Sequence, residues 1–285
     1  MRLFIFGYGF SGQALARKAR LQGWQVTATY RTDDTAHLRD GVQPVSLADA
    51  EGLIDQLDQA DAILITAPPG PTACPGLAVI TPSLIRRKLG PRWIGYLSTT
   101  GVYGDRNGGW VFETSPVAPR SPEAQRRVVA EGDWQDVGKR FGLTVTLHRL
   151  PGIYGPGRST LDRVRDHSAR RWDLPGQVFS RIHVDDLADG LLASIVRPRP
   201  GGIYNFCDDE PAANSRVVAE ACRLLGQPVP PAETLDLEAL TPRARRFWTE
   251  NKRVSNARAK AELGWRPTYP TYREGLAAIL AAEIK

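Results

Sequence analysis

The segment that most constrains the fold lies at the start of the chain. RLFIF at residues 2–6 is an apolar run of strand length, and the turn GYGFSG at 7–12 follows it directly. QALARKARLQG at 13–23 then repeats apolar residues at helical spacing, and WQVTATYR at 24–31 is typical of a second strand. A strand, a glycine-rich turn, a helix and a second strand in this order predict a unit that binds a dinucleotide.

The turn carries three glycines whose spacing has a physical reason. Gly7 permits the tight turn, Gly9 lets the backbone approach a pyrophosphate, and Gly12 lets the helix pack close to the strand. The helix N-terminus then presents free N–H groups and the positive end of its dipole to the phosphates. We therefore expect the cofactor to contact Gly7, Gly9, Phe10, Ser11 and Gly12. The alternative is a tight turn that binds no ligand.

The end of the second strand bears on which dinucleotide binds. An acidic residue there would bind the ribose hydroxyls and favour NAD. This strand instead ends in Tyr30-Arg31-Thr32, and the first acid is Asp33. Arg31 is placed to meet a 2′-phosphate, so we predict NADP over NAD. The alternative is that Arg31 is only an exposed residue and that Asp33 or Asp34 binds the ribose.

Strands and helices continue to alternate along the chain. Further strand-like runs lie at 43–49, 61–70, 92–104 and 143–157, with helical segments such as 76–89 and 122–141 between them. This alternation predicts an α/β fold with a doubly wound parallel sheet of the Rossmann type. Ligands of such sheets bind at the carboxyl ends of the strands. We therefore expect further cofactor contacts from Ala67, Pro68 and Pro151.

Six motifs in a fixed order point to a known family. They are GYGFSG at 7–12, STTGVYG at 98–104, RLPGIYGPGR at 149–158, RIHVDDLADG at 181–190, YNFCDDEP at 204–211 and KRVSNARAKAELGWRPTYPTYREGL at 252–276. The chain resembles the extended short-chain dehydrogenase/reductase superfamily, in its NAD(P)-dependent epimerase/dehydratase-like group. The resemblance implies a Rossmann domain and a smaller C-terminal substrate lobe. The expected domain comprises residues 1–155 and 181–206, and the expected lobe comprises 156–180 and 207–285.

The chain departs from the family pattern at the residues that transfer a proton to or from the substrate. Similar family members use a Ser or Thr, a Tyr and a Lys beside a hydride donor. Thr99 in STTGVYG matches the first position. The other two normally stand as Y-x-x-x-K, often with a Glu four residues later. Aligning that pattern on Glu131 places Arg127 at the lysine and Glu123 at the tyrosine, and a shift by one residue finds no tyrosine either.

Three further residues join Thr99 as candidates for catalysis, each with a structural alternative. Arg127 could bind a ribose but cannot shuttle protons. Glu123 paired with Arg127 would stay ionised and act as a base; alternatively it is a first-turn acid of a helix capped by Ser121 and begun by Pro122. Tyr103 is the other candidate acid, and its alternative is a buried aromatic residue with a structural hydrogen bond. Such departures are similar to those of the atypical members of the superfamily.

Charge and composition limit the partners. The net charge is +6, and Arg158, Arg163, Arg181 and Arg246 are candidates to bind an anionic small-molecule substrate. No nucleic-acid-reading motif accompanies the charge, and no long apolar run indicates contact with a membrane. The three cysteines form no metal-binding or disulfide pattern, so we expect no metal and a cytoplasmic location.

The sequence leaves two functions open. One is an NADP-dependent oxidoreductase, epimerase or dehydratase acting on a sugar or a nucleotide-sugar-like substrate. The other is a non-catalytic dinucleotide-binding protein that senses redox state or regulates a partner, which the missing Tyr and Lys favour. The resemblance also allows a homodimer that pairs through the helices expected at 76–89 and 122–141.

Overall fold

A computed structural model gives the fold, and it describes residues 1–30, 41–86, 90–241, 245 and 247–283. Its centre is a parallel sheet of seven strands in the order β11-β7-β5-β4-β1-β2-β3. The strands are β1 (Arg2–Phe6), β2 (Gln25–Tyr30), β3 (Gln43–Ser46), β4 (Ala62–Ile65), β5 (Trp93–Thr99), β7 (Val145–Leu150) and β11 (Ile203–Asn205). The chain reverses its direction of winding between β1 and β4, which is where such sheets bind their ligands.

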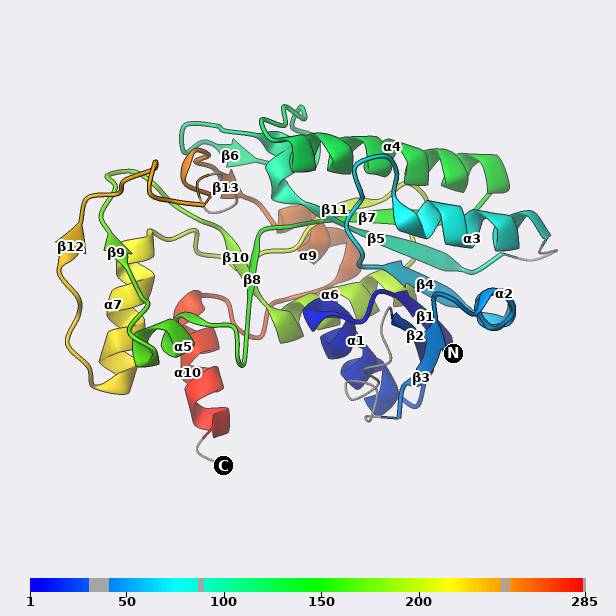
Figure 1. Cartoon of the computed structure of the whole chain (residues 1–285), viewed down its shortest axis with the longest axis horizontal. Coiled ribbons are helices and arrows are strands. Elements are labelled where there is room, and N and C mark those ends of the chain that lie inside the picture. Colours follow the sequence, from blue (N-terminus) through cyan, green and yellow to red (C-terminus); the bar gives the residue numbers. More distant parts are fainter. Residues whose placement is uncertain (31–40, 87–89, 242–244, 246, 284–285) are drawn as a thin grey trace.

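Helices cover both faces of the sheet, as Figure 1 shows. One face carries α1 (Phe10–Leu21), α6 (Val184–Val196) and α9 (Ala257–Leu263), and the other carries α2 (Ala50–Gln59), α3 (Pro75–Arg86) and α4 (Pro122–Phe141). Successive residues of β1 point to opposite faces of the sheet. Leu3 and Ile5 join the core under α1 and α6, whereas Phe4 and Phe6 join the core under α2 and α3. The predicted Rossmann-type sheet is confirmed.

A smaller body lies beyond the carboxyl ends of the central strands. Its helices are α5 (Thr160–Arg165), α7 (Asn214–Leu225) and α10 (Tyr272–Glu283), which share a separate apolar core that includes Leu161, Val218 and Leu276. Short strand pairs complete it and tie it to the sheet domain: β8 (Gly152–Tyr154) with β10 (Arg181–His183), β9 (Arg171–Trp172) with β12 (Ala232–Glu233), and β6 (Trp110–Val111) with β13 (Arg253–Val254). The division at residues 155, 180 and 206 stays a proposal.

Several element boundaries differ from the sequence predictions. The strand expected at 92–104 ends at Thr99, because Thr100–Tyr103 form a 3₁₀ turn, η2, capped by the Thr99 side chain. The run at 143–157 divides into β7 and β8, and β8 leaves the main sheet to pair with β10. Helix α6 begins at Val184, because the His183 ring accepts the cap hydrogen bond from the Asp185 amide.

Helix α9 packs on the sheet domain. Its residues Ala259 and Leu263 belong to the core of that domain, together with Trp265. The Trp265 indole donates a hydrogen bond of 3.1 Å to the carbonyl of Asp186 in α6. The C-terminal segment therefore returns to the sheet domain before α10 ends in the lobe.

Candidate active site

The glycine turn after β1 has the geometry that a dinucleotide requires. Gly7 has a φ of +99°, and a Cβ there would lie 2.6 Å from the Thr66 Oγ1 atom. A Cβ on Gly12 would lie 2.8 Å from the carbonyl oxygen of Gly7. A Cβ on Gly9, by contrast, meets nothing within 4 Å. Gly7 and Gly12 are thus needed for the turn itself, whereas Gly9 keeps open the space into which phosphates would fit.

Two threonines fix the turn, and the helix behind it offers free amides. The amide of Gly7 donates to the Thr29 Oγ1 atom at 2.8 Å, and the Thr66 hydroxyl donates to the Gly7 carbonyl at 2.7 Å. Helix α1 starts at Phe10 with Gly9 as its N-cap, and no side chain caps it. Its first amides are therefore available to phosphate oxygens. The residues present fit the pyrophosphate of a dinucleotide.

The remaining predicted cofactor contacts lie around this turn. Pro68 and Pro151 line the cavity described below, at the ends of β4 and β7, and the Ala67 amide donates to the Phe6 carbonyl at 3.3 Å. Arg31 lies outside the described residues, as do Asp33 and Asp34. The choice of NADP over NAD therefore stays a prediction.

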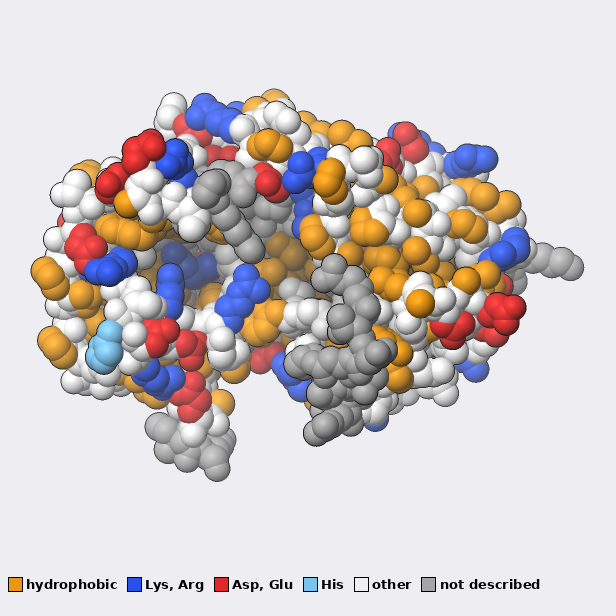
Figure 2. Space-filling model, in the orientation of Figure 1, with side chains coloured by type: hydrophobic (Ala, Val, Ile, Leu, Met, Phe, Trp, Pro, Cys, Tyr) orange, Lys and Arg blue, Asp and Glu red, His pale blue; other side chains and the backbone are white. Residues whose placement is uncertain are grey.

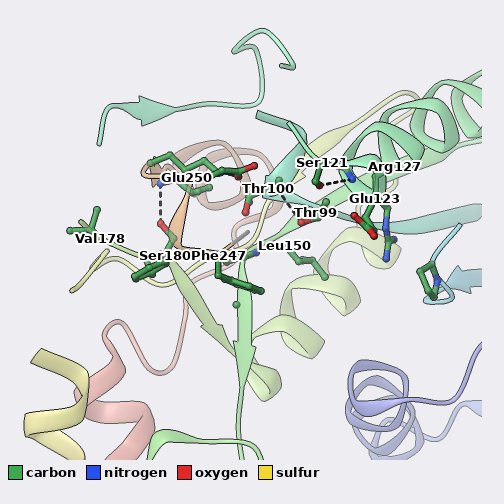
Figure 3. Close-up of a pocket in the computed structure, with 18 of the residues that line it drawn as sticks. Thr99, Thr100, Ser121, Glu123, Arg127, Leu150, Val178, Ser180, Phe247 and Glu250 are labelled. Carbon is green, nitrogen blue, oxygen red and sulfur yellow. Dashed lines mark hydrogen bonds and ion pairs between the residues drawn. The ribbon is translucent and has the colours of Figure 1, made fainter. Parts of the chain in front are cut away.

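A cavity of about 560 Å³ opens at the carboxyl ends of β5 and β7. Figure 2 shows the surface hollowed between the lobe and the sheet domain, with basic side chains along the hollow. Figure 3 shows Thr99, Glu123 and Arg127 on the side of the sheet domain, and Val178 and Glu250 on the side of the lobe. The carboxyl ends of β5 and β7 meet segments 178–180 and 247–254 here. A volume of this size suits a small substrate and the reactive end of a cofactor.

Thr99 is placed to bind a substrate oxygen. It is the last residue of β5, and its Oγ1 atom accepts a hydrogen bond of 3.1 Å from the Gly101 amide. This bond uses a lone pair of the hydroxyl and leaves its hydrogen available to a ligand in the cavity.

Glu123 and Arg127 both line the cavity from the first turns of α4, where Glu123 is the first-turn acid of the structural alternative. The carboxylate of Glu123 pairs with Arg126 at 3.6 Å, and its side chain is 53% exposed. Arg127 instead donates to the Leu97 carbonyl and, at 3.4 Å, to the Tyr96 hydroxyl. Its cation is thus held against the end of β5. Ser121 caps α4 as predicted, by accepting from the Ala124 amide.

Tyr103 is outside the cavity lining, and its surroundings favour the structural alternative. Its hydroxyl donates to the Asn205 Oδ1 atom at 2.8 Å and accepts from the Arg149 Nη1 atom at 3.1 Å. The side chain is fully buried, and this burial raises the pKa of the Tyr103 hydroxyl above its ordinary value. We therefore correct the expectation that Tyr103 serves as the proton donor.

The acid that anchored the motif alignment belongs to the same buried network. Glu131 holds Arg149 through two hydrogen bonds, of 3.1 and 2.7 Å, and accepts a third, of 2.6 Å, from Ser98. Both charged side chains are almost inaccessible. Because each charge is paired and hydrogen-bonded, the network can be buried, and it fixes β5, β7 and α4 relative to one another.

The cavity also contains an ionisable pair that the sequence does not predict. Lys252 and Glu250 line it from the lobe side, and their side chains are only 10% and 14% exposed. The Lys252 ammonium donates to the Gly104 carbonyl at 2.8 Å and pairs with the Glu250 carboxylate. Burial lowers the pKa of Lys252 below its ordinary value. Lys252 is the first residue of the motif at 252–276, but the motif does not place it at the cavity, because the pairing of β13 with β6 brings it to η2.

The arginines expected to hold an anion are scattered. Arg158 is exposed, with its guanidinium 5.4 Å from the centre of the Phe10 ring. Arg163 donates to Thr160, and Arg181 donates to the Ala212 carbonyl. None of these three lines the cavity, and Arg246 lies outside the described residues. Their role in substrate binding stays a prediction.

Comparisons with known proteins agree with this geometry. The model of the NAD dependent epimerase/dehydratase family matches residues 82–207. A 3-diazoavenalumate denitrifying reductase of Streptomyces sp is 30% identical over 270 residues, which cover 90% of this chain and 72% of the reductase. This chain belongs to the NAD-dependent epimerase/dehydratase family. Its Rossmann-type sheet, glycine turn and cavity are therefore those of a family of nicotinamide-dinucleotide-dependent proteins.

Solved structures of the family share the fold over its full length. A protein of unknown function from Silicibacter pomeroyi DSS is 44% identical, with a TM-score of 0.90, and the match covers 100% of this chain and 99% of that one. A UDP-glucose 4-epimerase from Thermus thermophilus, solved with NAD, has a TM-score of 0.78 at 20% identity, covering 99% and 98% of the two chains. At that identity the likeness concerns the fold alone.

Two further findings concern the described part of this family member. No helix there combines the length and apolar character that crossing a membrane requires. Its His, Cys, Asp and Glu side chains form no cluster that could hold a metal ion.

The helices expected to pair in a homodimer, α3 and α4, lie side by side on one face and expose Ile85 and Val129. The homodimer stays a prediction.

Proposed function

We propose that this protein is an NADP(H)-dependent oxidoreductase that works as a reductase on a small substrate bound in the cavity. The observation that carries the proposal is the meeting of three features at one edge of the sheet. They are the uncapped α1 N-terminus behind Gly9, the hydroxyl of Thr99 and the buried ammonium of Lys252. The name of the Streptomyces relative, a reductase, favours reduction over epimerisation or dehydration.

Each residue of the site has a part in this proposal. When bound, a reduced nicotinamide supplies a hydride, and the substrate needs one proton in addition to complete a two-electron reduction. Thr99 donates a hydrogen bond to the substrate atom that gains negative charge. Lys252 gives the proton from its ammonium, which the Gly104 carbonyl and Glu250 orient. Arg127 contributes a fixed positive charge at the place of the family lysine.

In this proposal Glu123 does not take over the proton-donating role of the family tyrosine. It is half-exposed and paired with Arg126, so in this proposal its carboxylate contributes charge at the cavity and does not supply the proton. The sugar or nucleotide-sugar-like substrate that the resemblance implies is one class within this proposal.

The test follows the loss of nicotinamide absorbance from NADPH-saturated protein over a panel of small carbonyl and conjugated compounds and nucleotide sugars. We expect substrate-dependent oxidation of NADPH that Thr99→Ala and Lys252→Met each lower by about 10²-fold or more. The matched control is Lys139→Met, which removes a lysine from the exposed end of α4 and should leave the rate unchanged. The rate should also fall as pH rises through the lowered pKa of Lys252, because only the ammonium form donates.

Two outcomes would count against this reading. A rate that is unchanged in Lys252→Met would remove that residue from the reaction. Tight NADPH binding without turnover on any member of the panel would favour the alternative of a non-catalytic redox sensor.

A further inference from the structure

The lobe side of the cavity differs from what a sugar ring requires. Resting on the proposed function, we propose that the substrate carries a flat aromatic or conjugated group, which packs on an aromatic wall formed by Phe179 and Phe247. Both residues line the cavity, and Figure 3 shows Phe247 on the side of the lobe. This inference names the class of substrate for the same site.

The wall is held in place from behind. Trp248 meets the Phe179 ring edge to face, at a centroid distance of 4.9 Å and an angle of 78°. Trp172 meets Trp248 in the same way at 4.6 Å and 89°. The backbone of Phe179 exchanges hydrogen bonds of 3.0 and 3.1 Å with Ala212. Phe179 therefore presents a fixed surface, and fixed aromatic surfaces favour flat partners.

Phe247 completes the wall at the mouth of the cavity. Its side chain lines the cavity and is nevertheless 57% exposed. This exposure leaves the Phe247 ring accessible to a ligand in the cavity. Val178 and Val254 extend the apolar surface on this side.

The polar groups on this side are few and already bonded to one another. Lys252 and Glu250 form an ion pair, and the Ser180 Oγ atom accepts from the Val254 amide at 3.0 Å. The charges of the described lining, Glu123, Arg127, Glu250 and Lys252, cancel. A sugar ring would need a partner for nearly every hydroxyl that it buries, and the ring faces of Phe179 and Phe247 offer none. A substrate with a flat apolar body and one polar end fits better.

The volume points to the same class. The cavity holds about 560 Å³ and must receive the reactive end of the cofactor as well as the substrate. Sites of about 300–1,000 Å³ suit ligands of ordinary small-molecule size. In this proposal a single-ring conjugated compound shares the cavity with the nicotinamide, and it takes up less of that space than a nucleotide sugar would.

The experiment measures binding and does not require turnover. Isothermal titration calorimetry of the full chain compares trans-cinnamate with UDP-glucose, each with and without saturating NADPH. We expect trans-cinnamate to bind more tightly than UDP-glucose, and Phe247→Ala to weaken it by about tenfold or more. The matched control is Phe112→Ala, because Phe112 is similarly exposed, at 49%, but lies outside the cavity lining.

The outcomes separate this inference from the proposed function. Tighter binding of UDP-glucose, or trans-cinnamate binding that Phe247→Ala leaves unchanged, would overturn the aromatic wall. Loss of NADPH binding alone would overturn the proposed function. In that case Phe247-dependent binding of trans-cinnamate without NADPH would still support the wall.

Discussion

At the scale of single residues, the structure separates polar groups that face the cavity from those that hold the core. Thr99, Glu123 and Arg127 could be placed at the site from the sequence, because each occupies a fixed position in a motif. The sequence could not show that the Tyr103 hydroxyl is bonded to Asn205, since that contact joins segments about a hundred residues apart. The sequence could not place Lys252 at the site for the same reason, since its contact with Gly104 also joins distant segments of the chain.

His148 gives a prediction at this scale. It is buried on β7, its Nε2 atom lies 3.1 Å from the Ser194 hydroxyl, and its ring stacks on Phe206 at 5.4 Å. Burial lowers the pKa of His148 to about 3. In the unfolded chain the value is about 6.5, so between these two pH values the unfolded state binds the additional proton. The stability contributed by neutral His148 is complete above about pH 6.5 and is lost as pH falls toward about 3.

The measurement is urea unfolding of the wild type and of His148→Gln at several pH values from about 7 down to about 5. The wild type should lose stability relative to the variant as pH falls, at up to about 1.4 kcal/mol per pH unit. Both proteins contain the same carboxyl groups, so the effect of these groups cancels when the two free energies of unfolding are subtracted. A difference that does not change with pH would show that His148 titrates normally in the folded protein.

At the scale of elements, local signals gave the strand, turn and helix at the N-terminus and the start of α4 correctly. Apolar runs, glycines and the Ser-Pro cap act within a few residues, so they are visible in one sequence. The sequence does not predict the short strand pairs β6–β13 and β9–β12, because two-residue strands have no periodicity to detect. Yet the first of these pairs brings the lysine of the lobe to the site.

The glycine turn gives the prediction for this scale. Gly9→Ala should fold normally, because a Cβ there meets nothing within 4 Å, but it should weaken NADPH binding by about tenfold or more, since the methyl group occupies the approach of the phosphates. The matched control is Gly132→Ala on α4, where a Cβ also meets nothing within 4 Å. It should keep NADPH affinity and gain up to about 1 kcal/mol of stability from helix propensity. Equal NADPH affinity in both variants, by fluorescence titration, would place the phosphates elsewhere.

At the scale of the whole molecule, the site exists only because the lobe closes over the edge of the sheet. The sheet domain supplies the glycine turn and Thr99, and the lobe supplies Lys252 and the aromatic wall of Phe179 and Phe247. The sequence predicted this architecture through the order of its motifs. It could not predict which lobe side chains face inward, because that depends on how two distinct apolar cores meet.

The central claim is that the glycine turn and the cavity together serve a nicotinamide dinucleotide. The most direct measurement is a paired equilibrium titration of the purified protein with NADPH and with NADH, followed by nicotinamide fluorescence. We predict tight binding of NADPH and weaker binding of NADH. Tighter binding of NADH would contradict the assignment of Arg31 and leave the site intact, whereas binding of neither dinucleotide would contradict the central claim itself.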